Sequence, residues 1–185
     1  MGRWAPDARG RLERAAMVLS AEQGYDATTV AQIATAAGVT ERTFYRHFPD
    51  KCDAFFPDNT GLLALLVEAV RGARAAGVGA APAALAAVHR LADIVLEEPE
   101  RILLGARVIP SVPVLAGRDL YRQAQIVDAV AATLTDDGVD ALAARLAAEQ
   151  AVGIWRVALR QWAAAPDEHS LTDVLDATSS ALRGP

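Results

Sequence analysis

Five side chains of unlike chemistry lie between residues 40 and 47 of this sequence and could together bind one ligand. If a helix begins after Thr40 and turns Phe44 and Phe48 into the core, the side chains that face outward are Glu41, Arg42, Thr43, Tyr45 and Arg46. A two-turn helix with such a mixed polar and aromatic surface is hard to explain by stability alone. The pattern fits a helix that reads base edges in a DNA major groove from its first turn.

The residues before this stretch predict the helix and the turn that would position it. A helix should begin at residue 28 or 29, because Thr29 and Gln32 have the spacing of a capping box. Its apolar face follows helical spacing through Val30, Ile33, Ala34 and Ala37. Gly38 allows the left-handed backbone of a sharp turn, and Thr40 can cap the next helix. These residues therefore predict a helix-turn-helix.

An earlier helix should complete a three-helix head. It is expected over about residues 7–23, with Asp7 as its N-cap and Gly24 as the residue that stops it. The six residues before it predict a frayed arm. Arg3 of this arm and Arg9 of the helix could reach a phosphate or the minor groove, or they could remain solvated.

The composition of the 185-residue chain favours an all-α protein. It is 52% hydrophobic but only 5% aromatic, and almost nothing alternates with the period of a strand. The apolar pattern predicts about nine helices. No apolar run approaches the roughly 20 residues of a membrane span, and the start lacks a signal peptide's apolar segment, so we expect a cytoplasmic protein without membrane contact. The single cysteine, Cys52, excludes an internal disulfide and a cysteine-built metal site, and it favours a packed residue over a redox switch.

The net charge of -5 looks wrong for a DNA-binding protein until the chain is divided. Residues 1–51 carry seven Arg or Lys against six Asp or Glu, whereas residues 52–185 carry eleven against seventeen. The acidity therefore lies in the second part, and the first part is free to approach phosphates.

At this point a resemblance to a known family becomes clear. Residues 28–51, TTVAQIATAAGVTERTFYRHFPDK, resemble the N-terminal DNA-binding domain of the tetracycline-repressor (TetR) family of bacterial regulators. The later segments RILLGARVIP and GRDLYRQ resemble the more divergent ligand domains of actinobacterial members. The resemblance implies a DNA-binding domain over residues 1–51 and a helical ligand-binding and dimerisation domain over residues 52–185.

The resemblance also implies roles for individual side chains of the head. Contacts with phosphates are expected from Thr29, Thr43, Tyr45, His47 and Lys51. Contacts with bases are expected from Glu41, Arg42 and Arg46, and the helix cap Thr40 is also counted among the DNA-binding residues. Arginine can bind guanine through two hydrogen bonds, and glutamate can accept one from cytosine. Lys51 is the only lysine and follows Pro49 at an expected helix start, where helix amides would add to its charge. Local packing or capping remains open for Tyr45 and His47, and a helix-dipole role remains open for Glu41.

The second part predicts a series of helices separated by glycines and prolines. A helix from about residue 50 should break near Phe56, because Pro57 cannot continue it. The small residues 72–82 predict a loop. Further helices are expected over about residues 82–98, 100–109, 115 or 119 to 134, 140–164 and 170–182.

The resemblance implies that the last two of these helices, residues 140–164 and 170–182, form a four-helix interface with a second copy. Their apolar positions are Leu142, Leu146, Ala147, Val152, Trp155, Leu159, Trp162, Leu171, Val174, Leu175, Thr178 and Leu182. For Trp155 and Trp162, a place in the ordinary core of one subunit remains the alternative.

An effector pocket is expected among the helices of the second part, apolar with a few polar anchors. Candidate lining residues are His89, Arg107, Tyr121, Arg122, Gln125, Trp155 and Arg156. Arg107 lies in an apolar helix, so it should be buried against Glu149, Asp128 or an anionic ligand. His89 and Asp93 lie one turn apart but lack a third ligand, so we predict no metal site.

Together these patterns predict a homodimeric transcriptional regulator, by default a repressor. It should bind a near-palindromic double-stranded DNA operator and respond to a small-molecule effector, without a cofactor. The other classes to weigh are a helical interaction protein without DNA binding and an enzyme. Three scattered histidines, one cysteine and the lack of a glycine-rich phosphate loop leave no candidate catalytic residue.

Overall fold

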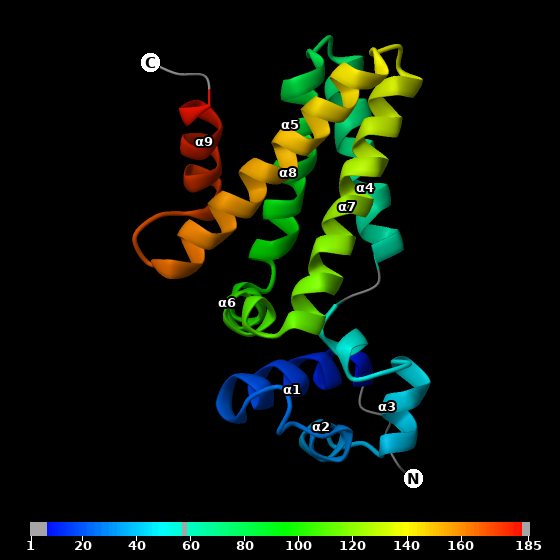
Figure 1. Ribbon diagram of the computed structural model, residues 1–185, viewed down its shortest axis with the longest axis vertical. Helices are drawn as coiled ribbons and strands as arrows, with labels where there is room; N and C mark the ends of the chain where they lie inside the picture. The colour runs from blue at the N-terminus through cyan, green and yellow to red at the C-terminus, as the bar shows by residue number, and fades with distance from the viewer. Residues whose placement is uncertain (1–6, 57–58, 183–185) are drawn as a thin grey trace. The chain divides into compact units, whose positions relative to one another are not determined.

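The computed structural model describes residues 7–56 and 59–182, and every regular element in these ranges is a helix (Figure 1). Nine α-helices and two short 3₁₀ helices form there, so the predicted all-α fold with about nine helices is confirmed. Within the described ranges, no helix is both long and apolar enough to cross a membrane.

Contacts divide the chain into two compact units, each built from segments that are distant in the sequence. The head unit contains α1 (Ala8–Gln23), α2 (Val30–Ala36), α3 (Glu41–His47), η1 (Cys52–Phe55), nearly all of α6 (Pro99–Val108), η2 (Ile109–Ser111) and the start of α7 (Pro113–Asp136). The C-terminal unit contains α4 (Asn59–Ala75), α5 (Ala80–Leu96), α7 from Leu120 onward, α8 (Ala141–Ala164) and α9 (Leu171–Ala181). The head unit therefore includes residues 100–119 in addition to the first helices of the chain.

The helix-turn-helix has the local structure that its sequence predicts. Thr29 and Gln32 form a reciprocal capping box at the start of α2. Gly38 has a φ of 68°, the left-handed conformation that a residue with a Cβ rarely adopts. The Thr40 side chain then accepts a hydrogen bond from the Thr43 amide at 3.2 Å and caps α3. Asp7 and Gly24 form the predicted caps of α1, and Asp140 and Ser170 cap α8 and α9.

One apolar cluster holds the head unit together. Its buried members from the first part of the chain are Leu12, Ala16, Met17, Ile33, Ala37, Phe44, Phe48, Cys52, Ala54, Phe55 and Phe56. Val108 of α6 and Leu115 of α7 belong to the same cluster and are 5% and 0% exposed. Two segments about 60 residues further along the chain therefore complete the core of the head.

The segment after the helix-turn-helix contains the expected break. Instead of one continuous helix from residue 50, the chain forms the four-residue η1, and Phe56 is extended with φ -127° and ψ 122°. This conformation is the one that a following proline favours. Pro57 itself lies outside the described residues, and α4 begins at Asn59.

Two of the expected boundaries are wrong. Residues 72–82 are not one loop, because α4 continues to Ala75 and α5 already begins at Ala80. Alanine is the strongest helix former, so only a short turn at Gly77, with φ 81°, separates the two helices. Helix α7 begins at Pro113 rather than at residue 115 or 119, because proline is well tolerated in a first helical turn.

The C-terminal unit is built around α5 and α8. Helix α5 packs against α4 and α8, and α9 packs against both α8 and α5. Trp155 and Trp162 of α8 are only 6% and 4% exposed within the single chain. The alternative that both tryptophans belong to the core of one subunit is therefore correct.

Candidate nucleic-acid interface and effector groove

Helix α3 buries one face and exposes the other, as expected for a helix that reads DNA. Phe44 is 0% exposed, and Phe48, the residue that ends the helix, is 1% exposed. On the outer side, Glu41, Arg42, Tyr45 and Arg46 are all exposed. The Tyr45 ring stands edge-on to Phe44, with 5.5 Å between ring centroids, so an aromatic pair supports its position.

Two of the predicted DNA-contacting threonines, Thr29 and Thr40, cap α2 and α3. The hydroxyl of Thr29 accepts from the Gln32 amide at 3.2 Å, and the hydroxyls of Thr40 and Thr43 lie 3.1 Å apart. These bonds hold the first turns of α2 and α3. Phosphate contacts by Thr29 and Thr43 stay predictions.

His47 is half-buried, which bears on its expected phosphate contact. Its Nε2 atom is buried and has no hydrogen-bond partner among the described residues. The ring lies beside Phe48, with 6.3 Å between centroids. Local packing of His47, the alternative left open by the sequence, therefore describes its position in the free chain.

Lys51 holds two backbone segments of the head together. Its Nζ atom donates to the carbonyls of Tyr25 at 2.6 Å and Thr28 at 2.9 Å. The same ammonium lies 3.8 Å from the centroid of the Tyr25 ring, a cation–π contact. Burial raises the pKa of the Tyr25 phenol to about 12, so the ring stays neutral beneath the charge. Lys51 directly precedes a helix, as expected, and that helix is the single 3₁₀ turn η1.

Arg9 is likewise engaged within the head. Its Nε donates to Glu13 Oε1 at 2.9 Å, and its guanidinium carbon lies 4.8 Å from the centroid of the Phe48 ring. Burial raises the pKa of the Glu13 carboxyl, and the charge of Arg9 opposes that shift. Arg9 thus packs against the residue that ends α3. Arg3 lies outside the described residues.

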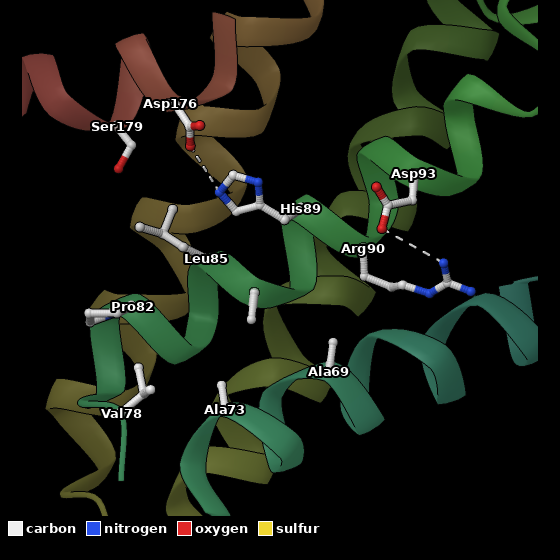
Figure 2. Close-up of a pocket in the computed structure, with 11 residues that line it drawn as sticks. Ala69, Ala73, Val78, Pro82, Leu85, His89, Arg90, Asp93, Asp176 and Ser179 are labelled. Carbon is white, nitrogen blue, oxygen red and sulfur yellow. Dashed lines mark ion pairs between the residues drawn. The ribbon is translucent and has the colours of Figure 1, made fainter. Parts of the chain in front are cut away.

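A surface groove of about 600 Å³ runs over the C-terminal unit, with α5 as its floor and residues of α4 and α9 along its sides (Figure 2). The apolar side chains of Ala73, Val78 and Pro82 lie at one end. At the other end, Arg90 and Asp93 point toward one another, with 3.8 Å between the nitrogen and oxygen of the pair. The groove therefore has an apolar end and a charged end.

His89 connects the floor of the groove to α9. Its Nε2 lies 3.3 Å from Oδ1 of Asp176, an ion pair when the imidazole is protonated (Figure 2). Asp93, which lies one turn from His89 on α5, pairs with Arg90 instead. Among the described residues, no three His, Cys, Asp or Glu side chains gather as a metal site would require.

Of the seven predicted pocket residues, His89 lies in this groove, and the other six are not among its described lining residues. Tyr121 is 63% exposed, Arg156 is exposed, and Trp155 is buried. Gln125 accepts a hydrogen bond from the Asn59 side chain at 2.9 Å, and Arg122 is half-buried. The seven residues therefore do not form one site.

The expectation of a buried Arg107 is wrong. Arg107 is exposed and lines a cavity of about 180 Å³ in the head unit with residues of α1 and η2. Its two proposed partners bind Arg145 instead, which donates to Asp128 at 2.6 Å and to Glu149 at 2.8 Å. A one-turn spacing links Arg145 and Glu149, so this pair was visible in the sequence.

Sequence reasoning missed two charged residues of the groove. Arg90 follows His89 directly and points to the other side of α5. The helical spacing of the residues on the groove's floor could have predicted that Arg90 lines the groove. Asp176 reaches the groove from α9. No local signal could identify it, because the contact joins positions 87 residues apart.

Comparisons with known proteins agree with the architecture. The family model described as "Bacterial regulatory proteins, tetR family" matches residues 13–55, and the model described as "MftR C-terminal domain" matches residues 78–185. The chain belongs to the TetR family of bacterial regulatory proteins. It is a DNA-binding transcriptional regulator with a helical ligand-binding C-terminal domain. Comparison with curated proteins gives no match.

Solved structures share the fold over nearly the whole chain. FadR of Bacillus halodurans, a fatty acid degradation regulator, is 18% identical, with 99% of this chain and 97% of that chain covered and a TM-score of 0.66. FadR of Thermus thermophilus, a transcriptional repressor solved with lauroyl-CoA, is 26% identical, with coverage of 94% and 92% and a TM-score of 0.57. FadR of Bacillus subtilis, solved with stearoyl-CoA, is 18% identical, with coverage of 94% and 96% and a TM-score of 0.61.

The two bonds of Lys51 predict a stability effect that a phosphate contact would not cause. We expect Lys51→Gln to lower the free energy of unfolding by about 1.5–3 kcal/mol, since a hydrogen bond from a charged group contributes about that much. Urea denaturation measures this change. A phosphate contact would instead reduce the slope of log K against log salt for DNA binding by about 0.9 per contact. Arg71→Gln on α4, which also removes one positive charge, is the control and should change neither quantity.

Proposed function

We propose that this regulator is a repressor that binds a near-palindromic operator as a homodimer, with one α3 helix of each copy in the major groove. The observation that carries the proposal is the outer face of α3, where Glu41, Arg42, Tyr45 and Arg46 are exposed above two buried phenylalanines. Occupying promoter DNA blocks polymerase, so repression is the default outcome.

The two parts of the chain divide this work in the proposal. Residues 1–51 bind DNA, and residues 52–185 bind the effector and the second copy. Phosphate contacts come from Thr29, Thr43, Tyr45, His47 and Lys51, and base contacts come from the first turn of α3. The protein works in the cytoplasm, where its operator lies, and the proposal includes no catalytic step.

Arg42 provides the sharpest test of base recognition, because it makes no hydrogen bond or ion pair within the described residues that would give it a structural role. We expect Arg42→Ala to weaken operator binding by about 1–3 kcal/mol and to relax the preference at one base pair of each half-site. Operator fragments come from selection of genomic DNA by the wild-type protein. Fluorescence anisotropy with single-base variants of that operator measures both effects.

Arg71→Ala, on an exposed part of α4, is the matched control for Arg42→Ala and should leave both affinity and preference unchanged. An Arg42→Ala protein with an unaltered base preference would contradict the base-reading role. Failure of the wild-type protein to recover any genomic fragment, or binding that does not weaken as salt rises, would contradict operator binding itself.

For the dimer, we propose an interface through the exposed sides of α8 and α9. Leu142 and Leu146 of α8 are 69% and 60% exposed, and Val157 on the same side of the helix is 42% exposed. The tryptophans expected to share this surface instead fill the core of one subunit. Large exposed aliphatic side chains along one helix are typical of a surface that a partner covers.

The exposed leucines of α8 predict where a charge would separate the two copies. We expect Leu146→Glu to shift the protein from dimer to monomer at micromolar concentration, because pairing would bury the new carboxylate against its symmetric copy. Sedimentation velocity measures the shift. Leu65→Glu, at a 44% exposed leucine of α4, is the matched control and should remain a dimer. Equal behaviour of the two variants would place the interface elsewhere.

For the effector, we propose that the groove on α5 binds a molecule with an apolar body and an acidic head group. The apolar end suits a hydrocarbon chain, and Arg90 at the charged end pairs with one carboxylate among the described residues, Asp93 at 3.8 Å. Two similar structures were solved with fatty acyl-CoA, so this class is the first to test. The effector releases the operator only to the extent that it binds the DNA-free conformation more tightly.

The charged end of the groove predicts how an acyl-CoA would be recognised. We expect lauroyl-CoA to dissociate the operator complex and Arg90→Ala to raise the required concentration about tenfold, the loss of one charge-assisted hydrogen bond. Anisotropy of labelled operator follows the release. Coenzyme A without an acyl chain should have no effect, and Arg71→Ala should respond as the wild type does. An Arg90→Ala response equal to the wild type would remove Arg90 from the site.

A further inference from the structure

Helix α7 begins inside the core of the head unit. Leu115, in its first turn, is 0% exposed and belongs to the apolar cluster that also contains Phe44 and Phe48. The same helix continues without interruption to Asp136 in the C-terminal unit. The first residues of α7 therefore make their contacts within the head unit, which contains the recognition helix α3.

One of these contacts reaches the segment directly behind α3. Arg118 of α7 forms a hydrogen-bonded ion pair with Oδ1 of Asp53 in η1. The Asp53 side chain is only 17% exposed, whereas the Arg118 side chain is 47% exposed, so the pair is partly shielded from water. Arg118 therefore fixes η1 against the start of α7.

A second set of hydrogen bonds links η1 to the residues that follow the recognition helix α3. The Asp53 amide donates to Asp50 Oδ1 at 3.0 Å, and the Asp50 amide donates to Asp53 Oδ2 at 3.3 Å. Asp50 is two residues beyond Phe48, which ends α3. An unbroken series of polar contacts thus runs from Arg118 through Asp53 to the residues that follow α3.

We propose that Arg118 and Asp53 are positioning residues for operator binding, which act through the orientation of α3 without touching DNA. The inference rests on the proposed operator binding. Asp53 uses both carboxylate oxygens, one for Arg118 and one for the Asp50 amide, so loss of the arginine frees the carboxylate to turn away. A head whose α3 is correctly oriented for only part of the time binds the operator more weakly in proportion to that fraction.

A double-mutant cycle tests this inference on the full-length protein. The variants are Arg118→Gln, Asp53→Asn and the two combined, and each keeps a side chain of similar shape. We expect each single variant to weaken binding of the selected operator about two- to fivefold, the range of a partly exposed ion pair. The combined variant should bind no worse than the weaker single variant, because both changes break the same contact. The salt dependence of binding should not change, since no phosphate contact is lost.

The matched control is a second Arg–Asp ion pair, which lies in the C-terminal unit. Arg74 Nε lies 2.6 Å from Asp137 Oδ2, so Arg74→Gln and Asp137→Asn remove a comparable interaction away from α3. These two changes should leave operator affinity unchanged. Thermal unfolding of every variant, followed by circular dichroism, shows whether affinity falls through global stability.

Three results would overturn the inference. In the first, the single variants bind the operator as tightly as the wild type does. In the second, the losses of affinity caused by the Arg118 and Asp53 changes multiply in the combined variant. In the third, the Arg74 and Asp137 variants lose as much affinity as the Arg118 and Asp53 variants. Wild-type protein that binds no operator would refute the proposed function instead, so the two failures are distinguishable. If Arg118→Gln unfolds the head, Arg118→Lys replaces it and should retain most of the wild-type affinity, because the charge remains.

Discussion

The burial of Phe44 and Phe48 is the interaction on which the DNA-binding surface depends. A helix of seven residues is too short to be stable alone, because the nucleation cost exceeds what a few hydrogen bonds return. Each ring is at most 1% exposed, and burying such a side chain contributes about 2–3 kcal/mol. The outer side of α3 can therefore carry polar residues suited to DNA contact, since the stability of the helix comes from its buried inner side.

The same core determines which other segments belong to the head. Val108 and Leu115 complete the apolar cluster, so α6 and the start of α7 fold with the first three helices. The chain behind α3 leaves helical structure at Phe56. Helix α7 has no such break between Pro113 and Asp136 and belongs to both units.

In the C-terminal unit, aromatic burial again decides what remains for binding. Trp155 and Trp162 fill the space within one subunit, so the surface proposed for a second copy is aliphatic and includes Leu142 and Leu146. The proposed effector groove forms where α9 packs on α5 and places Asp176 beside His89. Dimer surface and groove therefore share α9, and an effector that displaces Asp176 acts on an element of the proposed interface.

The sequence by itself determined the local structure of the head, because short-range rules govern it. The capping box of Thr29, the left-handed Gly38 and the cap at Thr40 depend on neighbours at most four residues away, and all three formed as predicted. The exposed face of α3 followed from helical periodicity alone. Boundaries in the alanine-rich segments were less predictable, because small residues suit both a helix and a loop.

Only the tertiary structure decided which distant residues meet. The ammonium of Lys51 donates to two carbonyls of the α1–α2 connection, more than 20 residues away, and its spacing in the sequence did not predict these bonds. Arg107 was expected to be buried and is exposed, and Arg145 binds the two carboxylates assigned to it. The pairing of Arg118 with Asp53 joins positions 65 residues apart. Charged side chains have many possible partners of equal chemistry, and only the packing of the apolar core brings one of them within hydrogen-bond distance.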